Sequence, residues 1–302
     1  MRAATHKFMA RWGLKPLLRP PFPLWLQRAV AAAGLWLNSR VARDVRVCGH
    51  PLGGVPGEQH TPRQVDDGRV LLYLHGGAFV IGSCGSHRAL ASRLASAAHA
   101  QAYVIDYRLA PEYPHPAQLQ DALTAYRALL ADGYDARNIL LAGDSAGAAL
   151  ALMTLLAIRE RKLPPPAALA LISPWVDFTL SGATHRTHAQ RDPLLDARWL
   201  VQALAWFSDG RPLPAPLLEA DYAGAPPTLI HVGSEEILLS DAENIAARLK
   251  GCGVAVELKR YDGLWHDFQL HAGVMAEADA ALDQMGAFLR QATAAGTARR
   301  AA

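Results

Sequence analysis

The chain has 302 residues, of which 51% are hydrophobic and 19% charged, and 30 basic against 27 acidic residues leave a formal net charge of +3. This composition argues against a disordered chain, which is poor in hydrophobic residues and rich in net charge, and it offers no excess of positive charge for nucleic acid. We therefore expect a folded protein that does not bind polyanions, with the length of one large α/β domain or of two small ones.

The N-terminal region is basic, and four prolines precede its apolar stretch, Ala29–Leu37. A signal peptide would place an apolar core soon after a short basic head, so we expect instead a proline-broken arm and then a helix over about Leu24–Asn38. The longest apolar run, Ala146–Ile158, is shorter than the roughly twenty residues of a membrane span. We expect a cytoplasmic protein without stable membrane insertion.

Three cysteines lie far apart, at Cys48, Cys84 and Cys252, and form no C-x-x-C pair. An odd number at such spacings favours neither a disulfide framework nor a cysteine-based zinc site. We expect a reducing compartment and no metal.

From residue 41 to 292, short apolar runs alternate with longer helical stretches. The expected strands are Asp44–Cys48, Val70–His75, Ala102–Asp106, Asn138–Ala142, Ala168–Ile172, Thr228–Val232 and Val254–Tyr261. The expected helices are Ser86–Ala100, Pro116–Asp132, Ala146–Arg161, Ser240–Gly251 and Ala276–Gln291. Several strands are apolar without interruption, which is typical of parallel strands covered by helices on both faces. The alternation predicts an α/β fold with a mostly parallel sheet.

Residues 178–227 interrupt this alternation. They contain one expected helix, Asp196–Ser208, and several prolines. Long insertions in compact domains are usually lids or binding loops. We expect this insertion and the N-terminal arm to form a small cap over the carboxyl edge of the sheet.

The strongest chemical motif is Gly-Asp-Ser-Ala-Gly at Gly143–Gly147, directly between an expected strand and an expected helix. A sharp turn there exposes the hydroxyl of Ser145, and the helix N-terminus directs N–H groups toward a developing oxyanion. The alternative is a serine that only caps the helix. The flanking strand and helix favour a nucleophile.

A second motif, His-Gly-Gly-Ala, ends the strand Val70–His75. Small residues let backbone N–H groups approach a carbonyl oxygen, so Gly76, Gly77, Ala78 and Ala146 are the expected oxyanion hole. Gly77, Ala78 and Ala146 are the expected N–H donors. A plain glycine turn is the alternative for this motif alone.

His75–Phe79, Asp106–Glu112 and Gly143–Gly147 together resemble the motifs of the hormone-sensitive-lipase-like (bacterial family IV) carboxylesterases, a branch of the α/β-hydrolases. The resemblance runs in order from about Arg43 to Leu289. It implies a mixed, mostly parallel eight-stranded sheet, a helical cap from about residues 1–42 and 178–225, and ester hydrolysis without a cofactor. The chain departs from the family at Ala78 and Asp267, where glycine is usual.

The resemblance also implies a catalytic histidine at His266, just past the last expected strand. His231 lies within an apolar strand and fits a core histidine, and His271 is expected at the start of the final helix. Asp144, beside the serine, is given no catalytic role.

The resemblance further implies that the acid of the triad lies in the loop after the strand Thr228–Val232, about thirty residues before the histidine. Counting back from His266 leads to Glu236, which can orient the imidazole and stabilise its charged form. Glu235 and Asp241 remain alternatives, and Asp241 also suits the start of a helix.

Side chains of the two cap segments suggest how the cap is built. Five of the seven tryptophans lie in the two cap segments, namely Trp12, Trp25, Trp36, Trp199 and Trp206. We expect their side chains to line an acyl pocket, and packing in the core is an equal alternative. His185 and His188 have a metal-like spacing, but without carboxylate partners they are expected on a solvated face.

We therefore expect a serine carboxylesterase that cleaves short-to-medium acyl esters through an acyl-enzyme. A lactonase or deacetylase would use the same residues, and a non-catalytic ligand-binding protein on this fold is the alternative of a different class. A homodimer is an open alternative to a monomer.

Overall fold

The apolar runs of the sequence form the middle of one eight-stranded sheet, in the order β1-β2-β4-β3-β5-β6-β7-β8. The computed structural model describes residues 3–18, 20–37, 39–66, 68–212 and 216–298. The strands are β1 (Val45–Gly49), β2 (Gly57–Pro62), β3 (Val70–Leu74), β4 (Gln101–Ile105), β5 (Ile139–Asp144), β6 (Ala168–Ile172), β7 (Thr228–Gly233) and β8 (Val256–Tyr261). Only β2 runs antiparallel to its neighbours β1 and β4, so the expected mostly parallel sheet is confirmed.

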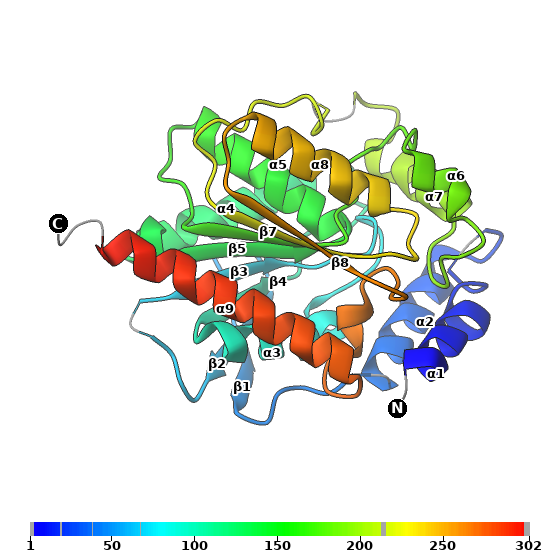
Figure 1. Cartoon of the computed structure of the whole chain (residues 1–302), viewed down its shortest axis with the longest axis horizontal. Helices are drawn as coiled ribbons and strands as arrows, with labels where there is room; N and C mark the ends of the chain where they lie inside the picture. Colours follow the sequence, from blue (N-terminus) through cyan, green and yellow to red (C-terminus); the bar gives the residue numbers. More distant parts are fainter. Residues whose placement is uncertain (1–2, 19, 38, 67, 213–215, 299–302) are drawn as a thin grey trace.

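Every residue of β3, β5, β6 and β7 is buried, because helices cover both faces of the sheet (Figure 1). On one face lie α3 (Cys84–Ala98) and α9 (Ala276–Ala298). On the other lie α4 (Ala117–Ala131), α5 (Ala146–Glu160) and α8 (Leu239–Gly251). Two 3-10 turns, Ala136–Asn138 and Phe268–His271, complete this part of the fold, and α9 continues past the expected end at Gln291. None of the helices in the described part of the chain has the length and hydropathy needed to cross a bilayer.

The strand β2 is absent from the sequence prediction. Its residues, Gly-Glu-Gln-His-Thr-Pro, are mostly polar and end in proline, so neither apolar alternation nor β propensity marks it. Pairing on both sides holds it in the sheet, and a Cβ at Gly57 would lie 2.5 Å from the carbonyl oxygen of Val104.

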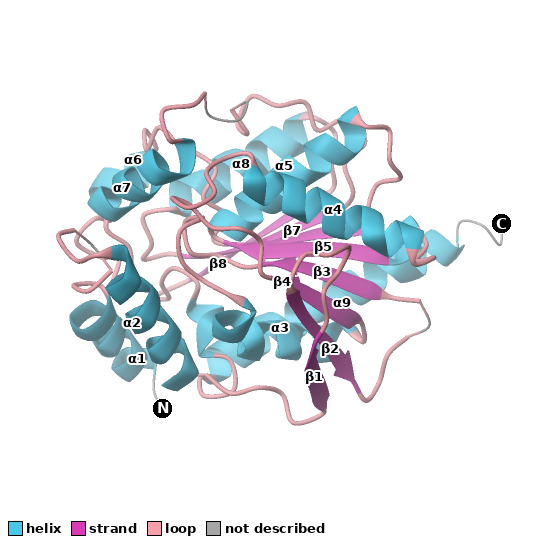
Figure 2. Ribbon diagram, turned by 180° about the vertical axis from the view of Figure 1, so that it is seen from behind, coloured by secondary structure: helices cyan, strands magenta, loops and turns pink. Residues whose placement is uncertain are grey.

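The N-terminal segment and the insertion lie together at the end of the molecule where the parallel strands finish (Figure 2). The N-terminal segment holds α1 (Ala3–Met9), a π-helical turn (Ala10–Leu14) and α2 (Leu24–Leu37), and the insertion holds α6 (Ala183–Thr187) and α7 (Ala197–Ser208). Residues 3–14 of the arm are helical, in addition to the helix that the sequence predicts from Leu24. Asn38, the expected end of that helix, and residues 213–215 of the insertion lie outside the described residues.

Several hydrogen bonds join these two segments. The guanidinium of Arg11 donates to the carbonyl of Arg191 at 2.6 Å, and the ammonium of Lys15 donates to the carbonyl of Asp192 at 2.6 Å. The buried indole N–H of Trp199 donates to the side chain of Gln27 at 2.8 Å. Two parts of the chain that are distant in sequence thus form one layer.

Candidate active site

Ser145 lies on the tight turn between β5 and α5. Its backbone has φ 51° and ψ −118°, a strained conformation for a residue with a side chain, and its N–H donates to the carbonyl of Ile172 at 2.8 Å. The flanking glycines allow this turn because other backbone lies against them. A Cβ at Gly147 would lie 2.0 Å from the carbonyl oxygen of Leu74, and one at Gly143 would lie 2.5 Å from that of Gly147.

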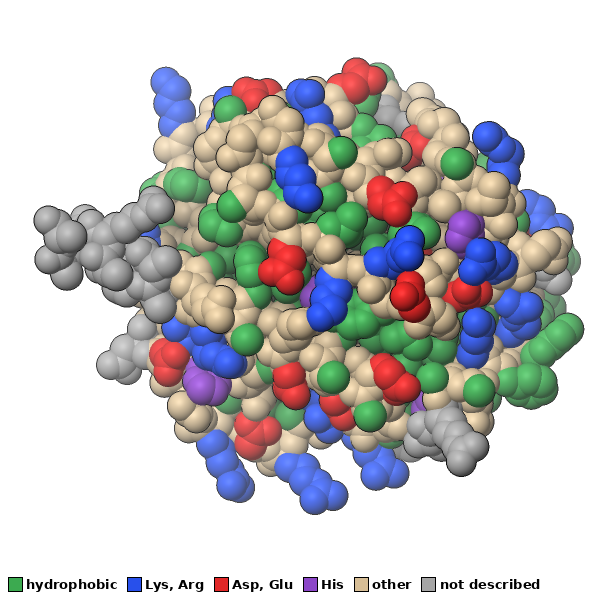
Figure 3. Space-filling model, in the orientation of Figure 1, with side chains coloured by type: hydrophobic (Ala, Val, Ile, Leu, Met, Phe, Trp, Pro, Cys, Tyr) green, Lys and Arg blue, Asp and Glu red, His purple; other side chains and the backbone are tan. Residues whose placement is uncertain are grey.

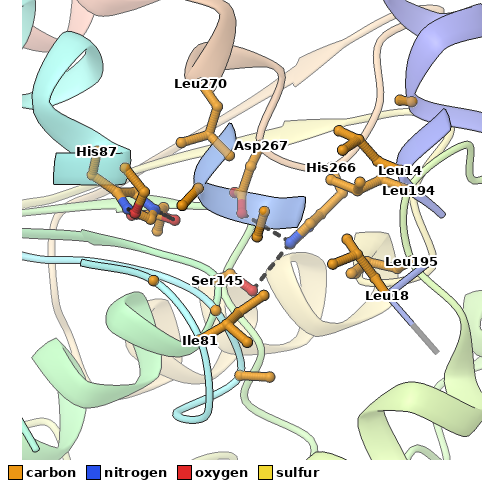
Figure 4. Close-up of a pocket in the computed structure, with 18 of the residues that line it drawn as sticks. Leu14, Leu18, Ile81, His87, Ser145, Leu194, Leu195, His266, Asp267 and Leu270 are labelled. Carbon is orange, nitrogen blue, oxygen red and sulfur yellow. Dashed lines mark hydrogen bonds and ion pairs between the residues drawn. The ribbon is translucent and has the colours of Figure 1, made fainter. Parts of the chain in front are cut away.

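The structure brings three of the expected site residues into one hydrogen-bonded chain. His266 Nε2 lies 3.1 Å from Ser145 Oγ, and His266 Nδ1 lies 2.9 Å from Glu236 Oε2. Figure 4 shows the first of these contacts at the base of a pocket. All three residues are buried, with 5% of Ser145 exposed to solvent. A hydroxyl, an imidazole and a carboxylate in this order can activate the hydroxyl as a nucleophile.

The carboxyl group of Glu236 is held in place by two further donors. The hydroxyl of Ser173, just after β6, donates to Oε1 at 2.9 Å, and the backbone N–H of Gly233 donates to the same oxygen at 2.6 Å. Oε2 is thereby directed at His266. Burial raises the pKa of Glu236, which the contact with His266 partly offsets.

The two other candidate acids have different partners. Glu235 forms an ion pair with Arg191 of the insertion. Asp241 is fully buried and accepts hydrogen bonds from the backbone of Val176 and Asp177 and from Nε2 of His185. Neither carboxyl contacts His266.

The histidines set aside in the sequence lie in other surroundings. His185 is buried against Asp241, so the expectation of a solvated face is wrong for it. His231 is buried in β7, where burial lowers its pKa to about 3. His271 belongs to the 3-10 turn rather than to the start of α9, and it packs against the ring of His6 at 4.5 Å.

The residues after β3 provide backbone N–H groups near Ser145. Gly77 and Ala78 both have positive φ, 112° and 51°, and both line the pocket that holds Ser145. Gly76 packs under them, where a Cβ would lie 2.1 Å from Asp144 Oδ2, and Ala146 begins α5. No backbone carbonyl of the described residues accepts a hydrogen bond from the N–H of Gly77, Ala78 or Ala146. These donors are therefore available to a ligand.

Beneath the turn, Asp144 forms a buried network of its own. Its carboxylate accepts from the hydroxyl of Tyr73 at 2.6 Å and lies 3.1 Å from Nε2 of His87. Burial opposes its ionisation, but His87 and Tyr73 more than offset this, so the pKa of Asp144 is lowered. The network supports the turn from below.

The pocket above Ser145 is a cavity of about 260 Å³ with mostly apolar walls. Its walls come from the N-terminal segment, the insertion and the segment after β8, through Ala10, Leu14, Leu18, Leu194, Leu195, Trp199, Trp265 and Leu270. Of the four expected tryptophans whose side chains the structure describes, only Trp199 lines it. Trp12 and Trp25 are 67% and 69% exposed, Trp206 packs against the core, and the side chain of Trp36 lies outside the described part.

One residue of this pocket, Asp267, was marked in the sequence only as a departure from the family. Its Oδ2 lies 2.9 Å from Nε2 of His266, the nitrogen that also faces Ser145 (Figure 4). Burial lowers the pKa of His266, but the carboxylates of Asp267 and Glu236 outweigh this and hold it well above its usual value. The imidazole therefore lies between two acids.

The strand order and the placement of a serine at this turn define an α/β hydrolase, and a family model described as "alpha/beta hydrolase fold" matches residues 71–270. The chain is 43% identical to an "Acetyl-hydrolase" of Streptomyces hygroscopicus over 76% of this chain and 78% of the relative. It is 36% identical to an "Esterase" of Acinetobacter venetianus over 78% and 79%. It superposes on a crystal structure of an esterase from the bacterial hormone-sensitive lipase family with a TM-score of 0.88 and 36% identity, covering 93% of this chain and 97% of that one.

The chain therefore belongs to the α/β-hydrolases, and within them to the hormone-sensitive-lipase-like carboxylesterases. This confirms the resemblance seen in the sequence. Its reaction class is the hydrolysis of carboxylic esters.

Proposed function

We propose that the chain hydrolyses short-to-medium acyl esters through a covalent acyl-enzyme on Ser145, with His266 as base and Glu236 as the acid that orients it. The observation that carries this proposal is the hydrogen-bonded chain from Ser145 Oγ through His266 to Glu236. The apolar cavity directly above Ser145 supports an acyl or alkyl group as its ligand.

In the acylation step, Ser145 Oγ attacks the ester carbonyl carbon while its proton passes to His266 Nε2. Glu236 accepts the Nδ1–H hydrogen bond, which fixes the tautomer and stabilises the imidazolium. The carbonyl oxygen becomes an oxyanion, and the N–H groups of Gly77, Ala78 and Ala146 are placed to hold it, with Gly76 shaping the turn. The proton on Nε2 then goes to the leaving alcohol.

In the deacylation step, a water molecule takes the position of the alcohol. His266 removes its proton, the resulting hydroxide adds to the acyl carbon, and the tetrahedral intermediate collapses to release the acid and restore Ser145. The proposal includes a cap of about residues 1–42 and 178–225 on a single hydrolase domain, and described residues of both segments supply walls of the cavity.

Covalent labelling tests the nucleophile. A p-nitrophenyl alkylphosphonate is expected to lose p-nitrophenolate and leave one phosphonyl group per chain, bonded to Ser145 Oγ. Peptide mass spectrometry locates the adduct, and esterase activity should fall in step with labelling. Ser145→Ala serves as the unlabelled control, and an adduct on any other residue that accompanies full inactivation contradicts the proposal.

Acyl-chain length tests the cavity. The cavity, at about 260 Å³, is small beside the roughly 300–1,000 Å³ of drug-sized sites, so kcat/KM for p-nitrophenyl butyrate should exceed that for the decanoate by about 100-fold. Trp199→Ala should narrow this ratio because the indole lines the wall, whereas Trp25→Ala should not because that indole is 69% exposed. A wild-type enzyme that prefers the decanoate would contradict the proposed substrate range.

The same proposal includes the partners and the location expected from the sequence. The ligand is a small-molecule ester, and no nucleic-acid partner is proposed because acidic and basic side chains are interspersed on the face shown in Figure 3. A cytoplasmic location fits three free cysteines. The homodimer stays a prediction open to test.

A further inference from the structure

Asp267 places an acid in the pocket that the proposed reaction does not use. Its backbone has φ 50°, a conformation that favours glycine, and the residue is 4% exposed. Oδ2 contacts His266, while Oδ1 is buried and accepts no hydrogen bond from the described residues. The residue lines the same cavity as Ser145. An unpartnered oxygen in a substrate cavity is costly unless the substrate supplies the donor.

The contact between Asp267 and His266 opposes the proposed first step. A base must receive the proton of Ser145 on Nε2, but an ionised Asp267 favours a proton already bound there. Burial raises the pKa of Asp267 to about 7, and the nearby charge of Asp144 adds to this effect, although His266 opposes it. A second donor that drew the Asp267 carboxyl away from Nε2 would remove this opposition.

No other group of the pocket takes that role. Among the described residues, the ion pair of Asp267 is with His266 alone. His87 is engaged by Asp144. Arg28, the cation of the cavity wall, donates to Glu112 and to the carbonyls of Val80 and Ala110. A donor group carried by the substrate would satisfy this oxygen.

The leaving alcohol is the part of the substrate within reach. Its oxygen takes a proton from His266 Nε2, the atom that lies 2.9 Å from Asp267 Oδ2. We therefore expect substituents one or two atoms beyond that oxygen to come close to the Asp267 carboxyl. A hydroxyl there would donate to the carboxyl and draw it away from the imidazole.

We propose that Asp267 is a specificity residue that accepts a hydrogen bond from a hydroxyl on the alcohol part of the ester, so that the natural substrates are esters of diols or polyols. This inference rests on the proposed function and adds its substrate class. Asp267 forms no covalent bond and needs no co-reactant.

A matched pair of esters tests this preference. 2-Hydroxyethyl acetate and propyl acetate differ only in a hydroxyl that replaces a methyl group. The wild type is expected to prefer the hydroxyethyl ester by about tenfold in kcat/KM, as a hydrogen bond to a charged group allows. Asp267→Gly, which suits the positive φ, should bring the ratio to one or below, because the apolar cavity then favours the propyl group.

Controls separate this role from a structural one. The ratio of the kcat/KM values for the two esters does not depend on the fraction of folded enzyme, because that fraction affects both values equally. Asp262→Asn, an exposed acid on the same segment, should keep the wild-type ratio. Asp267→Asn keeps the side-chain size and should lower the ratio. Both Asp267 variants should also shift the acidic limb of kcat/KM to lower pH, because His266 loses the carboxylate that raises its pKa.

Two failures remain distinguishable. If the wild type hydrolyses p-nitrophenyl acetate but prefers propyl acetate, or keeps its hydroxyethyl preference without Asp267, this inference is overturned and the proposed function stands. If the wild type hydrolyses none of the three esters, both the proposed function and this inference are contradicted.

Discussion

Replacing Ser145 by alanine is expected to lower kcat for p-nitrophenyl acetate by about 10⁴-fold or more, because the variant has no atom to form the acyl-enzyme. The fold should remain, since an alanine Cβ occupies the position of the serine Cβ and the backbone N–H of residue 145 still donates to Ile172. Stopped assays at high enzyme concentration measure the residual rate, and thermal unfolding checks the fold.

The matched control is Ser208→Ala at the end of α7, whose hydroxyl donates to the carbonyl of Ala205. Its rate should equal that of the wild type. A Ser145→Ala enzyme that keeps a tenth of the wild-type rate would rule out the serine mechanism.

Replacing Glu236 by glutamine is expected to lower kcat/KM by about 10³-fold. The amide keeps the shape of the side chain, but it loses the negative charge that stabilises the imidazolium, and its NH₂ group can face Nδ1 and impose the wrong tautomer. Ser173 and Gly233 keep donors directed at Oε1, so the side chain should stay in place. Steady-state kinetics with p-nitrophenyl acetate give the loss.

The two neighbouring acids provide the comparison. Glu235→Gln should stay close to the wild type, because its ion pair with Arg191 lies away from His266. Asp241→Asn should mainly lower the melting temperature, because the buried carboxylate accepts from two backbone N–H groups and from His185. Equal small losses of activity in all three variants would show that none of them is the acid.

Local signals in the sequence predicted much of the fold and much of the candidate site. The turn at Ser145 needs glycines at positions 143 and 147 because backbone oxygens lie where their Cβ atoms would be, and that requirement is visible as a motif. The strand β6 was predicted with its observed bounds, because a strand buried on both faces is apolar throughout. Features that are dictated by a few adjacent residues could be predicted.

Features that depend on contacts between residues distant in the sequence could not be predicted. The polar strand β2 exists because β1 and β4 pair with it, and Glu58 within it binds Arg88 of α3. The tryptophans of the cap were placed in the right segments, but the direction of each side chain follows from tertiary packing. The contact of Asp267 with His266 depends on a positive φ that no residue pattern indicated.

Chemistry and selectivity are carried by separate stretches of this polypeptide. The groups that would make and break bonds come from turns after β3, β5, β7 and β8. Many walls of the cavity come instead from residues 10–18 and 194–199. Hydrogen bonds from Lys15 and Trp199 hold the N-terminal segment and the insertion together. Mutations in those walls can therefore remodel which molecules enter while the reactive groups keep their alignment. Relatives that share one reaction could differ in substrate range in this way, and an engineered variant could be given a new substrate range by the same kind of change.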